Sequence, residues 1–336
     1  MISKDLQGIQ MNVTQIVRKS DRPNSVDRIL GQLNPILSTK VNLRVLTCPN
    51  SSEGIKNKLA NLNWARHIKD DVVHLTGDIN YLSFAISSPL VTTVLDLGMP
   101  GKMAKWKHKI FHKIWIDYPV SKSKVVITIS DKIRDEILER NSKYSGKVCT
   151  IYVPVGKEFV PFQKVIPSSS FRILHVATSA HNKNTFRMAQ ALNGLDVHYR
   201  IVGIVPDETR NYLIAENIPW SHGSHLSDQE MLDEYVKSDL VVFPSLYEGF
   251  GMPIVEAQSV GRVVLTSKLD PMLEIAGKGA IFVDPFDIPD IRNGIIDFMQ
   301  NSLKRDTLIQ EGFKNIERFK LESIAAQYLG SYENAL

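Results

Sequence analysis

Short apolar runs of four to six residues alternate along the chain with longer stretches in which apolar residues recur at helical spacing. The short runs are typical of buried strands. In the first half they are Val13–Val17, Leu43–Thr47, Val72–Thr76, Val91–Leu95 and Val125–Ile129, and in the second half Arg172–Ala177, Val197–Val202, Leu240–Phe243, Val263–Thr266 and Ala280–Val283. This alternation predicts an α/β fold with parallel sheets.

A segment rich in proline and serine separates two halves of similar pattern. Residues 153–170 contain three prolines and end in a run of three serines, a composition typical of a linker. A chain of 336 residues is also too long for one core of ordinary size. We therefore expect two α/β domains, at residues 1–157 and 158–316, followed by a terminal segment at residues 317–336.

The most informative stretch is residues 243–261, which read Phe-Pro-Ser-Leu-Tyr-Glu-Gly-Phe-Gly-Met-Pro-Ile-Val-Glu-Ala-Gln-Ser-Val-Gly. It follows an expected strand, and Pro253 and Gly261 suit the first turn and the end of a helix. Glu248 would then lie in the strand-to-helix loop, and Glu256 about one turn inside the helix.

This arrangement suits a ligand that carries negative charge between groups with hydroxyls. Gly249 and Gly251 would let backbone N–H groups approach a ligand where a side chain would block them. A helix N-terminus favours a diphosphate, and carboxylates beside it can accept hydrogen bonds from hydroxyls. The description fits a nucleotide sugar. The alternative is an ordinary strand–loop–helix unit with surface glutamates.

The stretch Glu-Gly-Phe-Gly-Met-Pro-Ile-Val-Glu-Ala resembles the Glu-x7-Glu signature of glycosyltransferase family 4. The resemblance covers most of the chain, closely from about residue 171 onward and loosely before it. It implies a retaining enzyme with the GT-B fold, in which two Rossmann-like domains face each other across a cleft. Residues 1–157 would then be the acceptor side, residues 158–316 would bind the nucleotide sugar, and a helix in 317–336 would pack back on the first domain.

The resemblance also implies roles for the residues of the signature. Glu256 is expected to bind the ribose hydroxyls and Glu248 to act at the transferred sugar. The backbone of Gly249, Phe250 and Gly251 is expected to face the sugar and the phosphates.

The loop Leu174-His-Val-Ala-Thr-Ser-Ala-His-Asn-Lys-Asn184 follows an expected strand and precedes a helix. A lysine in such a loop can neutralise a diphosphate as a point charge. Lys183 matches the lysine that similar proteins use for the donor phosphates, whereas Thr178 stands where they commonly have an arginine. Together with Asn182, these residues are candidates for donor contact, and a solvated loop lysine is the alternative.

Residues 220–232 resemble the family segment that lies over the nucleobase. Ser224 and Leu226 are candidates for contact with the base. Ser227 has the character of an N-cap, and Glu230 would complete a capping box. A capped helix without any ligand is the alternative for these residues.

The first half carries fewer signals. Asp96 ends an expected strand where similar proteins often have a His-Asp pair, and Leu95 occupies the histidine position. Asp96 is therefore either an active-site carboxylate or an aspartate of a turn. The loop that begins at Arg18 lacks the paired glycines common in similar proteins, so its arginines and Lys19 are candidates for contact with an acceptor.

The segment from Lys102 to Lys113 carries five lysines, two histidines and no acidic residue. Met103, Trp106 and Ile110 recur at helical spacing, so one face of this predicted helix is apolar. Basic amphipathic helices often lie on anionic membranes, which would suit a lipid-linked acceptor. The alternative is that the apolar face is core and the lysines are solvated. No nucleic-acid motif accompanies the basic patch, so we expect no nucleic-acid partner.

Composition limits the remaining possibilities. Hydrophobic content of 43% and charged content of 23% are ordinary for a globular protein, and no apolar run reaches the length of a bilayer span. Cys48 and Cys149 lack metal-ligand spacing, which favours a reducing, cytoplasmic location, with membrane association through Lys102 to Lys113 as an option. The chain contains no Asp-x-Asp, so we expect neither a metal nor another cofactor.

The resemblance, taken together with these observations, implies a retaining, metal-independent glycosyltransferase that moves a hexose from a UDP- or GDP-sugar to a glycan or lipid-linked acceptor, as in cell-surface polysaccharide biosynthesis. Lys183, Glu248 and Asp96 are the candidate catalytic residues. Two alternatives stay open: a non-catalytic protein that binds sugar nucleotides, and an epimerase or phosphorylase of the same fold.

Overall fold

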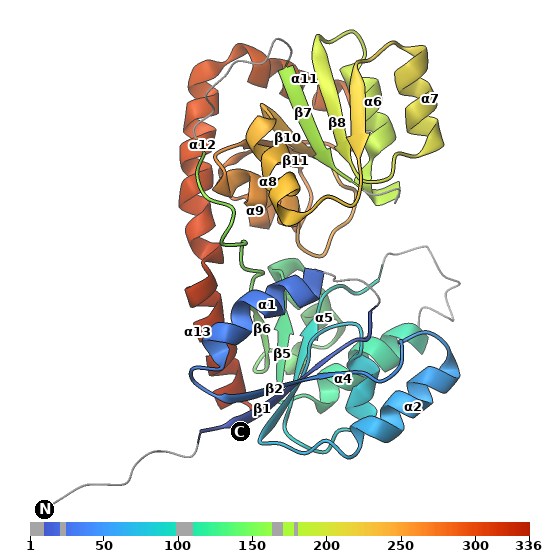
Figure 1. Cartoon of the computed structure of the whole chain (residues 1–336), viewed down its shortest axis with the longest axis vertical. Coiled ribbons are helices and arrows are strands. Elements are labelled where there is room, and N and C mark those ends of the chain that lie inside the picture. Colours follow the sequence, from blue (N-terminus) through green and yellow to red (C-terminus); the bar gives the residue numbers. More distant parts are fainter. Residues whose placement is uncertain (1–9, 21–24, 99–109, 163–170, 178–180) are drawn as a thin grey trace, which may run out of the picture. The chain divides into compact units, whose positions relative to one another are not determined.

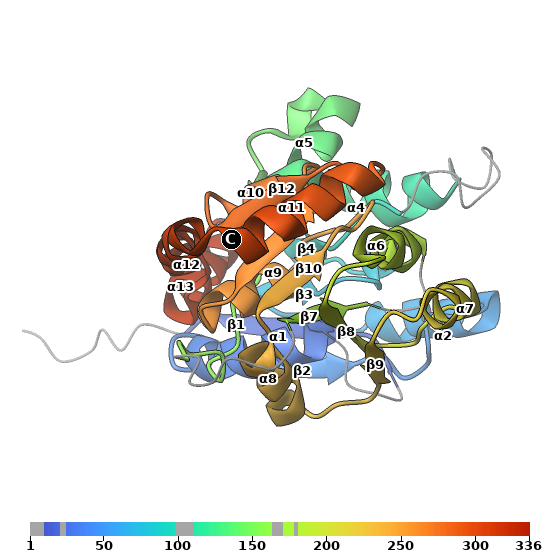
Figure 2. The same ribbon diagram turned by 90° about the horizontal axis from the view of Figure 1, so that it is seen from above.

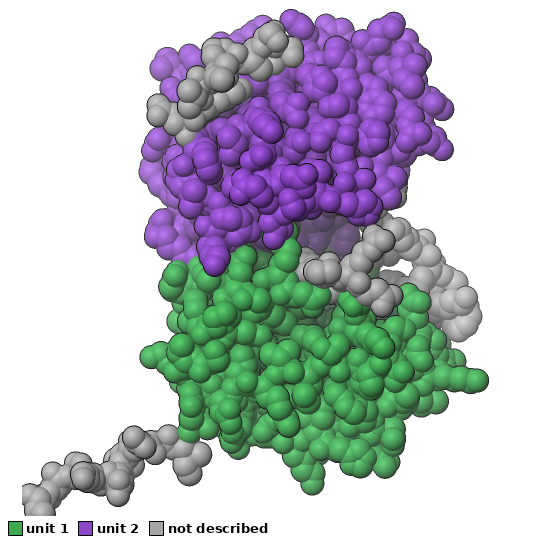
Figure 3. Space-filling view, in the orientation of Figure 1, with its two compact units in different colours: residues 1–154, 321–336 green, residues 155–320 purple. Residues whose placement is uncertain are grey.

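The structure of the protein is a computed structural model that describes residues 10–20, 25–98, 110–162, 171–177 and 181–336. The chain divides into two compact units (Figures 1 and 3). Unit 1 consists of residues 1–154 and 321–336, and unit 2 consists of residues 155–320.

Unit 1 is built on a parallel sheet of six strands in the order β2-β1-β3-β4-β5-β6. The strands are β1 (Asn12–Val17), β2 (Asn42–Thr47), β3 (Val72–Leu75), β4 (Leu90–Val94), β5 (Val125–Thr128) and β6 (Val148–Thr150). The helical elements are α1 (Ser25–Leu37), α2 (Ile55–Ala65), η1 (Asn80–Phe84), η2 (Lys113–Asp117), α4 (Tyr118–Lys122), α5 (Asp131–Arg140), η3 (Ser142–Tyr144) and α13 (Leu321–Glu333).

Helices cover both faces of this sheet because successive strand residues point to opposite sides. Val13 faces α1 and α13, where Leu33 and Tyr332 complete one core cluster. Ile16, three positions further along β1, joins the opposite cluster with Leu82 of η1. The last helix of the chain is therefore part of the core of unit 1.

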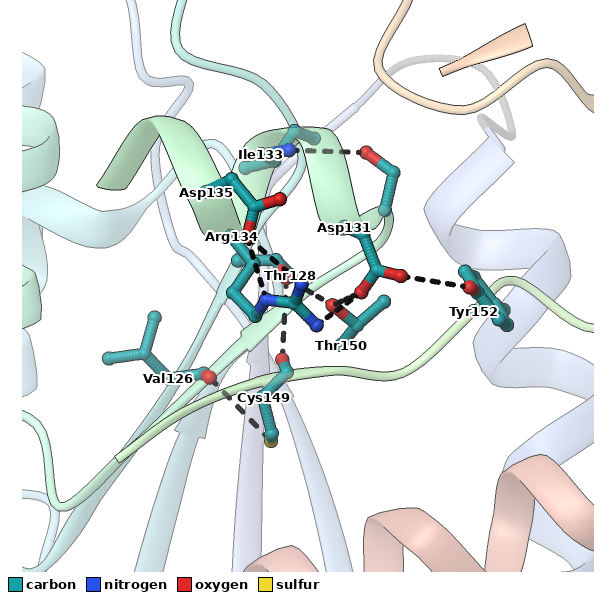
Figure 4. Close-up of polar contacts among 10 residues, drawn as sticks. Val126, Thr128, Asp131, Ile133, Arg134, Asp135, Cys149, Thr150 and Tyr152 are labelled. Atoms are coloured by element: carbon teal, nitrogen blue, oxygen red, sulfur yellow. Dashed lines mark hydrogen bonds and ion pairs between the residues drawn. The ribbon is translucent and has the colours of Figure 1, made fainter. Parts of the chain in front are cut away.

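The turn from β5 into α5 is fixed by polar contacts (Figure 4). The Ser130 hydroxyl caps α5 by accepting from the N–H of Ile133 at 3.5 Å. The Asp131 carboxylate accepts from the hydroxyls of Thr150 at 2.6 Å and Tyr152 at 3.4 Å. These contacts join the start of α5 to β6 and to the residues that follow it.

Unit 2 contains a second parallel sheet, with the order β12-β11-β10-β7-β8-β9. The strands are β7 (Phe171–Val176), β8 (Val197–Val202), β9 (Trp220–Gly223), β10 (Leu240–Phe243), β11 (Val263–Ser267) and β12 (Ala280–Val283). The helical elements are η4 (His181–Lys183), α6 (Thr185–Leu192), α7 (Asp207–Ala215), α8 (Asp228–Lys237), α9 (Met252–Ser259), α10 (Met272–Ala276), α11 (Ile288–Gln300), α12 (Ser302–Ile316) and η5 (Glu317–Phe319).

The helices of unit 2 also lie on both sides of its sheet. Figure 2 shows α6 and α7 on one side of the strands and α8 and α9 on the other. The core on the first side brings Met188 of α6 and Ile295 of α11 against Tyr199 and Val242 of the strands. All of these side chains are fully buried.

The α/β fold with parallel sheets is confirmed, and all ten expected strands are present within one residue of their predicted ends. The short outer strands β6 and β9 were not predicted. Within the segment 220–232, which resembles the family segment over the nucleobase, Trp220–Gly223 forms β9 by pairing with β8. In the part of the chain that the structure describes, no helix has both the length and the apolar character needed to cross a membrane.

Candidate functional site

The strand order of unit 2 reverses between β7 and β10. From β7 the chain continues outward to β8 and β9, then returns to β10 and continues to β11 and β12 on the other side. In open α/β sheets, ligands bind at such a switch point, outside the carboxyl ends of the strands. The loops that follow β7 and β10 are therefore where a ligand is expected, and they carry the residues of the two motifs.

The loop after β10 ends at Gly251, the N-cap of α9. Gly251 has a φ of +121°, which L side chains rarely adopt. A Cβ atom there would also lie 3.1 Å from Cδ1 of Ile254. Pro253 lies in the first turn of α9 as predicted, and Gly261 follows the end of the helix with a φ of +74°. The N-cap of α9 therefore carries no side chain.

Lys183, Asn182 and Glu248 come together at the switch point. The Nζ atom of Lys183 lies 2.7 Å from Oε1 of Glu248, and Nδ2 of Asn182 lies 3.4 Å from the same oxygen. The side chains of the ion pair are only 17% and 15% exposed. An ammonium group has three donors, so Lys183 can hold Glu248 and a phosphate oxygen at the same time.

The alternative of a solvated lysine therefore does not describe Lys183. Its ammonium group also lies 4.8 Å from the centre of the Phe243 ring, a cation–π contact. Removing the ammonium would leave the mostly buried Glu248 carboxylate without its ion pair.

Backbone contacts fix the loop of Lys183 to the loop of Glu248. Asn182 accepts at its carbonyl oxygen from the N–H of Leu246 at 2.8 Å and donates from Nδ2 to the carbonyl oxygen of Tyr247 at 3.0 Å. Asn184 has a φ of +59° and donates to the carbonyl oxygens of Pro244 and Pro285. A cavity of about 450 Å³ lies beside this loop, between the first turns of α6 and α7. Its volume is within the range of small-molecule sites.

Glu256 lies inside α9 and is only 6% exposed. Its Oε2 atom accepts a hydrogen bond of 2.6 Å from the hydroxyl of Tyr235, a fully buried residue of α8. The carboxylate is thus held between α8 and α9. Tyr235 gave no signal in the sequence, because an aromatic residue on a helix is ordinarily core.

Phe250 is 5% exposed, and its ring packs edge-to-face on Phe319 at 5.8 Å. Its side chain is therefore core, so only its backbone, with that of Gly249, is suited to the ligand contact that the sequence implied. Thr178, the residue at the arginine position, lies outside the described residues.

The segment proposed to contact a nucleobase follows β9. Ser224 is exposed, Leu226 is partly buried, and His225 between them has a φ of +58°. Ser227 and Glu230 form the predicted capping box at the start of α8. At the neighbouring Gly223, a Cβ atom would lie 2.6 Å from Nη2 of Arg200, so this arginine lies directly against the turn.

Unit 1 has its own cluster at the carboxyl ends of β1, β3 and β4. Asp96 accepts from the N–H of Gly98 at 2.8 Å, the contact of an aspartate in a turn. Arg18 and Asp78 form an ion pair nearby. Burial raises the pKa of Asp78, Arg18 lowers it, and Asp96 raises it again. Asp78 had no sequence motif, whereas Arg18 was already a candidate for acceptor contact.

Most of the basic segment from Lys102 to Lys113 lies outside the described residues, which begin again at Ile110. Ile110 and Lys113 are exposed. Ile114 and Trp115 pack against the core cluster of η1, and the ring of Trp115 stacks on Phe111 at 5.5 Å. The described end of the apolar face is therefore partly core, and membrane contact by the lysines stays a prediction.

Three comparisons with known proteins bear on this site. Residues 156–315 match the sequence model of the family described as "Glycosyl transferases group 1". The matched stretch lies in unit 2 and contains the Lys183–Glu248 pair and α9.

Relatives extend the similarity beyond the group 1 domain. O-antigen chain mannosyltransferase B of Escherichia coli is 23% identical over 300 residues, which cover 80% of this chain and 76% of that protein. The MMP alpha-(1->4)-mannosyltransferase of Mycolicibacterium hassiacum is 26% identical over 276 residues, which cover 74% of this chain and 66% of that protein. These similarities support a glycosyltransferase.

The fold is shared with solved structures. Anabaena HepE in complex with UDP and glucose superimposes with a TM-score of 0.73 at 16% identity, covering 95% of this chain and 98% of that one. The chain has the GT-B fold, as predicted: two α/β units, each with a parallel sheet of Rossmann-like topology. Among the described residues, no three His, Cys, Asp or Glu side chains are grouped so that they could hold a metal ion.

Proposed function

We propose that the protein is a retaining glycosyltransferase of family 4 that transfers a hexosyl group from a UDP- or GDP-sugar to a glycan or lipid-linked acceptor. We further propose that it acts in cell-surface polysaccharide biosynthesis at the cytoplasmic side of a membrane. A mannosyl group is the first candidate for the transferred sugar, because the relatives named above are mannosyltransferases.

One observation carries the proposal. The loops after β7 and β10 bring Lys183 and Glu248 within 2.7 Å of each other at the switch point of the sheet. The N-terminus of α9 follows in the same loop, with Gly251 at its cap. A cation and a helix N-terminus suit a diphosphate, while a carboxylate beside them suits sugar hydroxyls.

In the proposed reaction, the bond between the sugar C1 and the donor diphosphate breaks, and its electron pair stays on the diphosphate. Lys183 and the amides of the α9 N-terminus stabilise this developing charge, which is usually the largest contribution to catalysis of this kind. Glu248 orients the sugar. An acceptor oxygen bonds to C1 on the face that the diphosphate leaves, and its proton passes to the departing diphosphate.

The remaining contacts would hold the donor and the acceptor. Glu256 would accept from the ribose hydroxyls, and Ser224 and Leu226 would contact the base. In unit 1, Asp96 with Arg18 would contact the acceptor. The residues named here require no metal ion, since the charge of the diphosphate is met by Lys183 and backbone amides.

A transfer assay tests the proposal. The purified chain would be incubated with UDP-glucose, UDP-galactose or GDP-mannose and a membrane glycolipid extract, with and without EDTA. We expect one donor to be consumed with release of its nucleoside diphosphate, equally in both conditions, and the anomeric configuration of the product to match that of the donor.

A matched pair of variants makes the assay specific. Lys183→Ala should lower release of the diphosphate by roughly a hundredfold or more, whereas Lys278→Ala, at an exposed lysine of the same unit, should leave it unchanged. If nucleotides raise the melting temperature but no donor is consumed, the protein binds sugar nucleotides without catalysis, and the proposal is overturned.

A further inference from the structure

Helix α8 carries two neighbouring residues that make buried polar contacts to different elements. Glu234 reaches the strands β7 and β8, and Tyr235 reaches α9. Adjacent residues of a helix point about 100° apart, so the two contacts fix both the position and the rotation of α8.

The first contact is an ion-pair cluster. The two carboxylate oxygens of Glu234 each lie 2.7 Å from an arginine, Oε2 from Nη2 of Arg172 and Oε1 from Nη2 of Arg200. Glu234 is only 9% exposed. Burial alone would raise the pKa of Glu234, but the two arginines outweigh it and lower the pKa. The residue is therefore a charged anchor that holds α8 on the sheet.

The second contact joins α8 to the candidate ribose carboxylate. The hydroxyl of Tyr235 donates to Oε2 of Glu256 at 2.6 Å, a distance typical of a charge-assisted hydrogen bond. Tyr235 is fully buried, and its ring packs edge-to-face on Phe159 at 5.7 Å. A phenol fixed on both sides in this way holds the carboxylate in one orientation.

We propose that Tyr235 is a positioning residue that sets the selectivity of the donor site for a ribonucleotide. The inference rests on the proposed function, because it takes Glu256 to be the group that accepts from ribose hydroxyls. One hydrogen bond to Oε2 uses one of roughly four acceptor positions of a carboxylate. Tyr235 thus orients Glu256 through Oε2.

Helix α8 also connects the orientation of Glu256 to the proposed contact with the base. The capping box of Ser227 and Glu230 begins α8 directly after Ser224 and Leu226. Because Glu234 anchors α8, the first turn of this helix fixes the segment that is proposed to contact the base. Tyr235, in the third turn, fixes the orientation of Glu256 on α9. Recognition of the base and of the sugar hydroxyls would depend on one rigid element.

The test compares nucleotides with and without the 2′-hydroxyl. GDP and 2′-deoxy-GDP, with UDP and 2′-deoxy-UDP in parallel, would be titrated into the wild type and into Tyr235→Phe by calorimetry. Losing one charge-assisted hydrogen bond should weaken ribonucleotide binding by about tenfold. Binding of the 2′-deoxynucleotide should weaken less, so the ratio of the affinities for the ribonucleotide and the 2′-deoxynucleotide should fall.

A double-mutant cycle separates positioning from a general loss of structure. Because Tyr235 acts through Glu256, Tyr235→Phe should have no further effect on affinity in a Glu256→Ala background. Damage to the fold would persist in that background. Tyr332→Phe is the matched control: it removes another fully buried tyrosine hydroxyl, in unit 1, and should leave nucleotide affinity unchanged.

The possible results are distinguishable. If Glu256→Ala weakens ribonucleotide binding but Tyr235→Phe leaves affinity and ribose preference within twofold of wild type, the inference about Tyr235 is overturned and the donor site stands. An effect of Tyr235→Phe that is equally large in the Glu256→Ala background also overturns it. If Glu256→Ala itself leaves affinity unchanged, the donor-site assignment is overturned.

Discussion

Two buried histidines, one in each unit, should make the protein sensitive to mild acid. His74 of β3 and His175 of β7 are both fully buried. Nδ1 of His74 lies 3.0 Å from the hydroxyl of Tyr332, and Nδ1 of His175 lies 2.7 Å from that of Tyr199. A hydroxyl can donate or accept, so each of these hydrogen bonds is compatible with a neutral or a protonated imidazole. Burial therefore determines which protonation state of the histidine is favoured.

Burial lowers the pKa of His74 from 6.5 to about 3. The pKa of His175 also falls to about 3, through burial first and then through the charge of Lys183. A histidine with a lowered folded-state pKa stabilises the fold above its unfolded-state pKa of 6.5, and this contribution is lost as the pH falls toward 3. Between pH 7.5 and pH 5, each histidine should therefore remove about 2 kcal/mol from the free energy of unfolding.

Native-state hydrogen exchange read by mass spectrometry can measure each unit separately. Protection in the core strands of both units should fall between pH 7.5 and pH 5 by the equivalent of about 2 kcal/mol, after correction for the intrinsic exchange rate. In His74→Gln, unit 1 should lose most of this pH dependence while unit 2 keeps it. His67→Gln, at an exposed histidine of unit 1, is the matched control and should behave as the wild type.

The reasoning would be refuted if the free energy of unfolding of both units at pH 5 equalled that at pH 7.5. It would also fail for unit 1 if His74→Gln and the wild type lost the same free energy of unfolding over this range. Either outcome would mean that the buried imidazoles gain a proton in the folded state at little cost.

The remaining predictions concern function. Glu256→Ala should weaken nucleotide binding by about 1.5–3 kcal/mol, the range for charge-assisted hydrogen bonds, and an unchanged affinity in a titration would contradict its assignment. Lys183→Ala should lower turnover at saturating donor by roughly a hundredfold or more, and it should also lower the melting temperature because Glu248 loses its partner; equal turnover would contradict the role. Replacing Lys105, Lys109 and Lys113 with glutamine should release the protein from anionic liposomes at low salt without unfolding it. Each lysine near the membrane surface contributes about 1 kcal/mol to the free energy of membrane binding. If the wild type stays in the supernatant at low salt, these lysines are only solvated.

Much of the fold could be predicted because its signals are local. Most of the ten predicted strands are short apolar runs, and strands buried at every position, such as β3, β4, β5 and β10, are marked by that run alone. The missed strands β6 and β9 lie at the edges of their sheets. Trp220–Gly223 is only partly buried or exposed at every position, so no apolar run marked it.

The sequence by itself determined which loops carry the proposed chemistry. Gly251, Pro253 and the capping box of Ser227 act through their own backbone and nearest neighbours, so their roles follow from residue type and order. The sequence placed Lys183 and Glu248 in two loops that follow strands, but it did not show that their side chains form an ion pair.

Only the tertiary structure decided which side chains meet. The Lys183–Glu248 pair joins residues 65 positions apart, and the Tyr235–Glu256 hydrogen bond joins residues 21 positions apart on different helices. Such contacts depend on how the strands are ordered and how the helices pack on them, which no local pattern encodes. The sequence therefore identified a cation and two carboxylates, while packing determined that one carboxylate lies beside the cation and that the other is held by a buried tyrosine.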